Sequence, residues 1–170
     1  MSITLEELLL SRDKRKQLQE YLLQKYQGGT LICLTVVMPG NNKRNENSLI
    51  VAKAGISEVE KRFDGHIIYS QHNDLQTGYE FFAITDIDSN TSKIISCHIE
   101  ENHFLGRLFD IDIIDANGIQ IQRESVGYEK RKCLVSDNEA RFCMRNFTHT
   151  QEEIQQKISS MIENYKHIVQ

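Results

Sequence analysis

Apolar residues recur at helical spacing in three parts of the chain. In residues 4–26 leucines stand three or four positions apart, and Thr4 and Glu7 have the spacing of a capping box. Similar spacing, less regular, is present in residues 47–63, and it returns in residues 150–169. We therefore predict a helix in each of these three segments.

Continuous and alternating apolar segments predict strands between the helices. Residues 30–38 form a nearly continuous apolar run rich in β-branched side chains, which is typical of a central strand covered on both faces. Residues 66–71 and 79–85 flank a polar turn and predict a hairpin. Residues 119–122 follow another turn-like segment and predict one further short strand.

Residues 106–114 show the clearest alternation. Leu108, Asp110 and Asp112 point to one side of an extended strand, and the apolar residues between them point to the other. Residues 89–102 fit a helix or a strand, and their length and Ser/Thr-rich start favour a helix. The order of elements predicts an α+β fold in which helices pack against a mixed β-sheet.

Composition narrows the class of protein. At 170 residues and 39% hydrophobic content, the chain is long enough for one sizeable core, so we predict a single domain over residues 1–170. Four cysteines are too few for a secreted disulfide scaffold and indicate reduced thiols. Glu6 and Glu7 argue against a secretory signal, and the longest apolar run, residues 31–38, is too short to cross a bilayer. We expect a soluble, cytoplasmic protein with no membrane partner.

The charge distribution argues against nucleic acid as a partner but leaves anionic ligands open. The formal net charge of -4 provides no general basic surface. Basic residues nevertheless form three clusters: Arg12, Lys14, Arg15 and Lys16; Lys43 and Arg44; and Arg123, Lys130, Arg131 and Lys132. Such clusters usually face solvent, and contact with an anionic ligand is the alternative interpretation.

Asp110 and Asp112 are the main candidates for chemistry. On one strand their backbone positions lie roughly 6 to 7 Å apart on the same face, so both carboxylates can reach one hard cation or a pair. Mg²⁺ held in this way supports phosphoryl and nucleotidyl transfer. Gly106 and Arg107 add close backbone approach and a guanidinium group that fits phosphate oxygens. A solvent-facing aspartate pair at a strand end is the alternative.

The same three-residue pattern occurs a second time in the chain. Asp86, Ile87 and Asp88 precede a polar segment, residues 89–92, that resembles a turn and the start of a helix. We interpret this copy as a turn with a helix cap. Context therefore distinguishes the two copies.

A metal site of this type needs a further ligand or a general base. Glu100, Glu101 and Asp115 are the nearest acidic residues in sequence, and Glu100 can return to the site from the end of the preceding segment. His103 is a candidate base or phosphate ligand. For each residue an ordinary surface or packing role is the alternative.

Cys133, Cys143 and His149 suggest zinc, which binds thiolate and imidazole groups. Ser136, however, occupies the position where the second ligand of a Cys-x-x-Cys pair would stand. Because three ligands do not complete a structural zinc site, we predict reduced, partly buried cysteines instead. The sequence contains no P-loop, nucleophile elbow or metalloprotease helix motif.

Several of these motifs, taken in order, resemble one enzyme family. The matching segments are Leu10 to Asp13, Val37 to Gly40 with Lys43, His103 to Asp112, then Arg123, Gly127 and Arg131 to Leu134. They cover most of the chain, and residues 103–112 are the most specific among them. In this series they resemble the citrate lyase holo-acyl-carrier-protein synthases, the CitX family.

The resemblance implies a reaction and a set of site residues. It implies transfer of a prosthetic group from triphosphoribosyl-dephospho-CoA to a serine of the citrate lyase acyl carrier protein, with release of diphosphate. The enzyme would be nucleotidyltransferase-like, with Mg²⁺ on Asp110 and Asp112 and with Arg107 as a catalytic residue. From its position in the sequence, we add Glu100 as a further metal ligand. Candidates for binding the substrates are Arg12, Lys43, His103, Gly106, Arg123 and Arg131. The cluster Lys130 to Lys132 is our candidate for docking an acidic carrier protein.

Two positions depart from the family pattern, and two other functions stay open. Phe104 stands where proline is common, which alters loop stiffness, and Ser136 stands where a second cysteine is common. One alternative function is a noncatalytic chaperone that binds the carrier protein during assembly. The paired aspartates argue against it, because a binding module has no use for two adjacent like charges. The other alternative is the analogous synthase for malonate decarboxylase.

Overall fold

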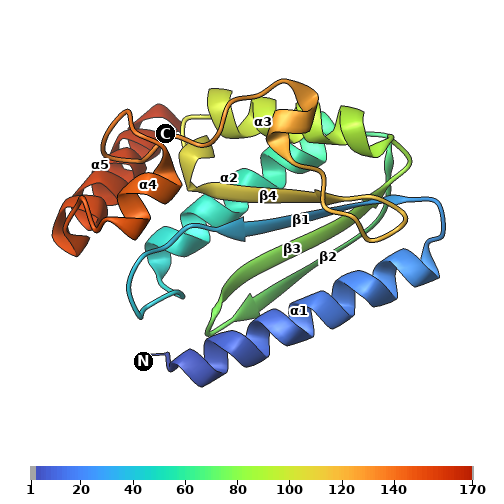
Figure 1. Ribbon diagram of the computed structural model, residues 1–170, viewed down its shortest axis with the longest axis horizontal. Helices are drawn as coiled ribbons and strands as arrows, with labels where there is room; N and C mark the ends of the chain where they lie inside the picture. The colour runs from blue at the N-terminus through green and yellow to red at the C-terminus, as the bar shows by residue number, and fades with distance from the viewer. Residues whose placement is uncertain (1–2, 170) are drawn as a thin grey trace.

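A four-stranded β-sheet with helices on both faces forms the protein (Figure 1). The computed structural model describes residues 3–169, so Met1, Ser2 and Gln170 at the ends of the predicted domain lie outside it. In chain order the elements are α1 (Leu5–Lys25), β1 (Thr30–Val36), α2 (Glu46–Arg62), β2 (Ile67–Leu75), β3 (Gly78–Thr85), α3 (Ser89–Asn102), the 3-10 helix η1 (Gly106–Leu108), β4 (Phe109–Ile114), the 3-10 helix η2 (Arg123–Val126), α4 (Ala140–Arg145) and α5 (Gln151–Val169). None of the helices in residues 3–169 combines the length and the apolar character that a bilayer crossing requires.

The strand order is β2-β3-β1-β4, and every neighbouring pair is antiparallel. The α+β class is confirmed, whereas the predicted mixed sheet is wrong. Strands β3 and β4, joined through α3, do run in the same direction. They do not pair, however, because β1 lies between them and is antiparallel to both. The order of helices and strands along the chain could not reveal this insertion.

Local sequence accounts for most of the elements. The predicted capping box starts α1, since the Thr4 hydroxyl accepts the Glu7 N–H at 3.2 Å and the Glu7 carboxylate accepts the Thr4 N–H at 2.8 Å. Segment 89–102 is a helix, as predicted. The predicted strand at 119–122 is wrong: this segment contributes a single bridge, between Ile114 and Gln120.

The two faces of the sheet are covered differently. On one face α2, α3 and α5 enclose the larger apolar core, to which β1 contributes Ile32 and Leu34. On the other face α1 packs over a smaller core that includes Leu31 and Cys33 of β1. Strand β1 is therefore buried on both faces, as its apolar run predicts. The smaller core lies toward the Leu22 end of α1, and the opposite end of this face borders a cleft instead.

Candidate functional site

A row of polar side chains crosses the α1 face of the sheet, beyond the smaller core. In the strand registers Asp110 lies opposite Thr35, Thr35 opposite Glu80, and Glu80 opposite Asn73. Residues directly opposite each other on antiparallel strands project to the same face. Asp112 lies on this face as well, opposite Cys33. The predicted alternation is confirmed from Phe109 to Ile113, because Phe109, Ile111 and Ile113 are buried in the other core. It is wrong for the start of the predicted strand: residues 106–108 form η1, and Leu108 is buried in the other core instead of lying beside the aspartates.

The two carboxylates of this row meet different partners. Glu80 is buried, and its Oε1 lies 2.9 Å from Nε of Arg15 on α1. Asp110 is about half exposed, with 48% of its side chain accessible, and its Oδ1 accepts from Nη1 of Arg131 at 3.0 Å. The Glu80 charge is therefore compensated beneath α1, whereas Asp110 stays accessible to a ligand.

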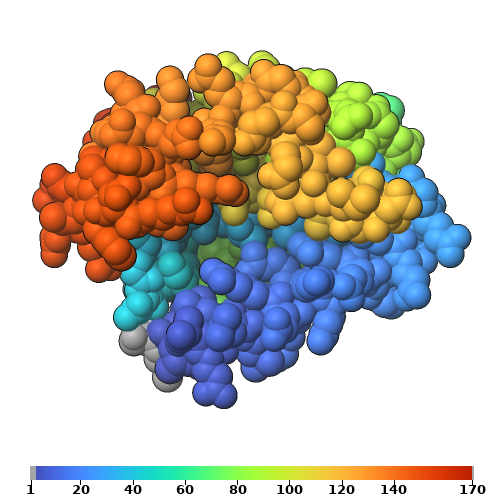
Figure 2. All heavy atoms as spheres, viewed as in Figure 1, coloured from blue at the N-terminus to red at the C-terminus, as the bar shows by residue number. Residues whose placement is uncertain are grey.

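Asp110 lies on the floor of a cleft of about 690 Å³ between α1 and the C-terminal part of the chain. Figure 2 shows this hollow between the N-terminal helix below and residues of the 120–150 region above. The lining includes two basic residues predicted as substrate ligands, Arg12 and Lys43, and an apolar wall from Leu134, Met144 and Ile154. The cleft thus combines cationic and apolar surface beside the carboxylate.

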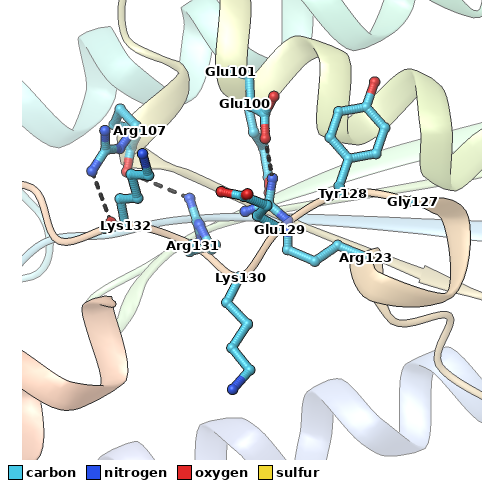
Figure 3. A pocket seen from close by; sticks show the side chains of 10 residues that line it. All are labelled: Glu100, Glu101, Arg107, Arg123, Gly127, Tyr128, Glu129, Lys130, Arg131 and Lys132. Atoms are coloured by element: carbon cyan, nitrogen blue, oxygen red, sulfur yellow. Dashed lines mark hydrogen bonds and ion pairs between the residues drawn. The ribbon is translucent and has the colours of Figure 1, made fainter. Parts of the chain in front are cut away.

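A second cleft, of about 440 Å³, meets the first at Asp110. It brings together six of the predicted site residues: Glu100, Arg107, Asp110, Asp112, Arg123 and Arg131. Next to it, a hollow of about 420 Å³ is lined by Glu101, Tyr128, Glu129 and the basic cluster Lys130 to Lys132 (Figure 3). Residues from α3, η1, β4 and the 123–132 loop therefore form one continuous charged surface.

Side chains replace a fifth strand along the free edge of β4. The Ile111 N–H donates to Oε1 of Glu100 at 2.9 Å, and Nζ of Lys93 donates to the Ile111 carbonyl at 3.1 Å. The guanidinium of Arg131 donates to the Phe109 carbonyl. Unpaired strand edges otherwise invite pairing with another chain, so these contacts stabilise the edge and orient Asp110 and Asp112 on it.

Lys93 and Glu80 are site residues that the sequence analysis missed. Lys93 is buried on α3, on the same helical face as Ser96 and Glu100. A polar series at positions i, i+3 and i+7 of a helix was the available signal. For Glu80 the sequence held no comparable signal, because its neighbours in β3 are apolar and its partner Arg15 is distant in sequence.

Burial and like charge act together on Asp112. Burial raises the pKa of its carboxyl group, and the nearby Asp110 raises it further, against the opposing effect of Lys93. Burial also raises the pKa of Glu100, although Arg131 and the Ile111 N–H oppose the change. Two carboxylates that repel each other on a rigid strand form an oxygen donor set that suits Mg²⁺.

Glu100 is not grouped with the aspartate pair as a third ligand. Among residues 3–169, these three carboxylates do not all bring ligand oxygens within 4.8 Å of one another. One Glu100 oxygen is occupied by the Ile111 N–H. The geometry favours a site with two protein carboxylates, and Mg²⁺ commonly completes such a site with water and substrate phosphates.

The predicted basic ligands divide into two groups. Arg107 donates to the Lys132 carbonyl at 2.7 Å, Arg123 donates to Glu101 at 2.7 Å, and Arg131 binds Asp110. These three contacts hold the 123–133 segment to α3, η1 and β4. For Arg12, by contrast, no hydrogen bond or ion pair is present within residues 3–169, and Lys43 donates only to the Met38 carbonyl.

Arg12 and Lys43 are close enough to affect each other. Burial lowers the pKa of the Lys43 ammonium group, and the positive charge of Arg12 lowers it further. Two cations held together beside a cleft repel each other unless an anion lies between them. This pair is therefore more available to a phosphate group than the three partnered arginines.

Two predicted substrate residues lie outside these clefts. The His103 ring packs against Phe109, with ring centroids 4.9 Å apart, and its Nδ1 accepts the Leu105 N–H at 3.0 Å. Burial lowers the pKa of this imidazole. A Cβ atom on Gly106 would lie 2.6 Å from the Ile99 carbonyl oxygen, so this glycine permits η1 to pack closely against α3. Both residues have a packing role in the larger core.

The four cysteines are unpaired and buried, as predicted for reduced thiols. Two of them lie closer to a histidine than the sequence indicated, because Cys133, Cys143 and His149 bring their ligand atoms within 4.8 Å of one another. Burial tends to raise the pKa of the Cys133 thiol, but hydrogen bonds from the N–H groups of Val135 and Ser136 lower it to about 7. This cluster belongs to the wall of the larger cleft.

Comparison with known proteins gives one consistent result. The family model "CitX: Apo-citrate lyase phosphoribosyl-dephospho-CoA transferase" matches residues 3–165. A Vibrio cholerae protein named probable apo-citrate lyase phosphoribosyl-dephospho-CoA transferase is 32% identical over 169 residues, covering 97% of this chain and 94% of the relative. A Streptococcus pyogenes protein of the same name is 30% identical over 168 residues, covering 96% and 88%.

A third relative is much longer than this chain. Protein CitXG of Haemophilus influenzae is 32% identical over 166 residues, which cover 96% of this chain and 36% of CitXG. The chain thus spans about a third of that relative and most of the other two.

Proposed function

Because the chain belongs to the CitX family, we propose that it transfers the phosphoribosyl-dephospho-CoA group from triphosphoribosyl-dephospho-CoA to a serine of the citrate lyase acyl carrier protein, releasing diphosphate. The observation that carries this proposal is the Asp110 and Asp112 pair beside a cleft that contains Arg12 and Lys43. Nucleotidyl transfer is supported by a carboxylate pair that can hold a metal and by cations that no acidic side chain neutralises. The four unpaired cysteines support action in the reducing cytoplasm.

Asp110 and Asp112 would hold Mg²⁺, which supplies charge neutralisation at the reacting phosphate when bound. The serine oxygen attacks the α-phosphorus, the bond from phosphorus to the diphosphate oxygen breaks, and the serine proton passes to solvent as diphosphate leaves. Edge contacts from Glu100, Lys93 and Arg131 keep β4 rigid. The two aspartates therefore need little reorganisation when the substrates bind, which lowers the barrier.

Arg12 and Lys43 are the proposed ligands of the triphosphate. Both line the larger cleft next to Asp110, and their mutual repulsion in the free protein is relieved when an anion binds between them. The apolar wall of the same cleft, which includes Leu134 and Met144, offers contact surface for the dephospho-CoA part of the donor. The donor would thus lie along the larger cleft with its reacting phosphate at Asp110.

The carrier protein is proposed to approach from the other side of Asp110. Lys130 and Lys132 are exposed beside the second cleft, where a basic surface attracts an acidic partner and increases the rate of encounter. Arg107 binds the backbone of this segment and fixes the position of the basic cluster. Each substrate then has its own entrance, and the two meet at the carboxylate pair.

Mass spectrometry of the carrier protein tests the reaction. Apo carrier protein of citrate lyase is incubated with the donor, Mg²⁺ and the native enzyme, with Asp110→Asn, with Asp112→Asn, or with the matched control Asp86→Asn. We expect the prosthetic-group mass on the carrier with the native enzyme and the control, and none with the two site variants. Modification by both site variants would keep the reaction and reject the metal pair.

The same experiment separates the two other functions. A folded native protein that binds the carrier but adds no mass would support the assembly chaperone. Replacement of the acceptor by the malonate decarboxylase carrier protein tests the third possibility. Faster modification of that acceptor than of the citrate lyase carrier would reassign the enzyme to malonate decarboxylase.

A further inference from the structure

The cysteine and histidine cluster lies in the wall of the larger cleft and is separate from the carboxylate pair and from Arg12 and Lys43, which take no part in it. The ligand atoms of Cys133, Cys143 and His149 lie within 4.8 Å of one another. Ser136 joins them: its Oγ lies 3.4 Å from Sγ of Cys143 and 3.2 Å from Nε2 of His149. Four polar side chains therefore gather in one small volume, and three of them are common zinc ligands.

We propose that Cys133, Cys143 and His149 bind Zn²⁺ as three protein ligands, with a water molecule hydrogen-bonded to Ser136 in the fourth position. Zinc lies about 2.3 Å from thiolate sulfur and about 2.0 to 2.1 Å from imidazole nitrogen, so its ligand atoms stand roughly 3.5 to 4 Å apart. The observed cluster reaches that spacing with small side-chain movements. Two thiolates and one imidazole also favour zinc over Mg²⁺ or Ca²⁺, which prefer oxygen ligands.

The few buried side chains in the C-terminal part of the chain indicate that a bound metal would stabilise this segment. Between Ile114 and Ile158 the only buried side chains are those of Cys133 and Cys143. The segment between Ile114 and Ile158 therefore has almost no apolar core of its own. Where a segment lacks such a core, the free energy of metal binding can replace it.

The backbone around the cluster is arranged to present the ligands. Near the first ligand, the Cys133 N–H donates to the Asn138 carbonyl at 2.7 Å, and the N–H groups of Val135 and Ser136 approach the Cys133 sulfur. Such N–H contacts stabilise a metal-bound thiolate. Near the third ligand, Phe147 has a φ of 48°, a strained conformation for a bulky residue, and it turns the chain between Cys143 and His149.

With three protein ligands this is not the closed four-ligand site rejected from the sequence, but a site with one open position that would still join the two ends of segment 133–149. It does not depend on the proposed transfer reaction. Segment 133–149 supplies Leu134, Ala140 and Met144 to both clefts. Zinc would hold this wall in place and would take no part in the reaction at the carboxylate pair. Its binding is measurable without either substrate, so failure of one proposal leaves the other intact.

Zinc binding to the purified, reduced protein is the test. Metal content is measured by mass spectrometry after growth with zinc, and affinity is measured by competition with a chromogenic chelator, for the native protein, Cys143→Ala, His149→Ala and Ser136→Cys. Cys97→Ser is the matched control, because Cys97 is equally buried but lies outside the cluster. We expect nearly stoichiometric zinc in the native protein and the control, and affinity at least about 10-fold weaker in the two alanine variants.

Ser136→Cys keeps the test decisive if an alanine variant does not fold. The introduced side chain would be the third thiolate and the fourth protein ligand of a complete tetrahedral site, so this variant should bind zinc at least about 10-fold more tightly than the native protein. Unchanged affinity in Ser136→Cys would overturn the proposal. Absence of zinc from the folded native protein, or a Cys133–Cys143 disulfide formed under the reducing buffer, would overturn it as well.

Discussion

The two Asp-Ile-Asp segments have the same three residues and opposite environments. Asp110 and Asp112 lie on a rigid strand between two clefts, with both carboxylates on one face. Asp86 and Asp88 lie in the turn between β3 and α3. There Asp86 contacts Nδ1 of His66 at 2.7 Å, and Asp88 caps α3 by accepting the Thr91 N–H at 3.0 Å.

The two environments shift the pKa values of their carboxyl groups in opposite directions. Hydrogen bonds from Thr91 lower the pKa of Asp88, so the charged form is satisfied locally. Burial and Asp110 raise the pKa of Asp112, although Lys93 and a hydrogen bond from Gln120 oppose the change, so a cation bound by the pair would stabilise the charged form. A carboxylate pair thus indicates chemistry where the fold holds two like charges together beside a cleft, and not where local hydrogen bonds satisfy each charge separately.

The largest expected effect on kcat/KM comes from removing a charge from the Asp110 and Asp112 copy, with the same change in the other copy as the comparison. Asp110→Asn and Asp112→Asn should each lower kcat/KM for transfer to the carrier protein by at least about 100-fold, because each removes a ligand for the charge on the reacting phosphate. Asp86→Asn should leave kcat/KM unchanged. Steady-state kinetics measures all three, and circular dichroism confirms that the variants are folded. Equal losses in the two copies would show that the comparison is wrong.

The partners of the two copies should differ in importance as well. Arg131→Met removes the ion pair to Asp110 and the donor to the Phe109 carbonyl, and it should lower kcat/KM by about 10-fold through disorder of the β4 edge. His66→Ala removes the partner of Asp86 and should have no effect on kcat/KM. A kinetic loss in His66→Ala as large as in Arg131→Met would contradict this assignment.

Stability should respond to the capping copy instead. Asp88→Ala removes the N-cap of α3 and should lower the midpoint of thermal unfolding by a few degrees, with kcat/KM retained at a temperature where the variant is folded. Asp88→Asn keeps a capping side chain and serves as the control, with a smaller decrease. Differential scanning calorimetry measures both. A midpoint equal to that of the native protein in Asp88→Ala would remove the capping role.

The smallest effect is an opposite pH dependence of the two copies. Asp112 binds its proton more tightly when folded, so its stabilising contribution is full below the unfolded pKa near about 4 and is lost as pH rises through the folded pKa. Asp88 has a lowered pKa, so its contribution is present above the unfolded pKa and is lost as pH falls through the folded pKa.

Urea unfolding between about pH 3 and pH 7 measures this difference. The stability of Asp112→Asn relative to the native protein should increase with pH, and that of Asp88→Ala should decrease. Two variants whose relative stability changes in the same direction would contradict the assigned environments.

Local sequence was a good guide wherever one element decided the outcome. The capping box of α1, the two-sided burial of β1, the helix over residues 89–102 and the alternation in β4 all follow from periodicity and capping residues. The mixed sheet and the strand at 119–122 were wrong because strand pairing is decided between distant segments. In place of a paired fifth strand, the edge of β4 is completed mainly by side chains of Lys93, Glu100 and Arg131.

The candidate site was predictable in part for the same reason. Asp110 and Asp112 stand two residues apart, so their common face is a property of the strand itself. His103 and Gly106 share the most specific sequence motif, yet the fold directs them into packing contacts. Glu80 depends on Arg15, which lies more than one helix and one strand away in sequence.

By itself the sequence determined the carboxylate pair, the family and most helices and strands, because these depend on residues close together in the chain. Tertiary structure alone decided which charges are compensated. It paired Arg107, Arg123 and Arg131 with neighbouring backbone and acidic groups, and it left Arg12 and Lys43 facing the larger cleft. It also brought His149 to two cysteines, since only packing of distant segments can set the distances on which ion pairing and metal binding depend.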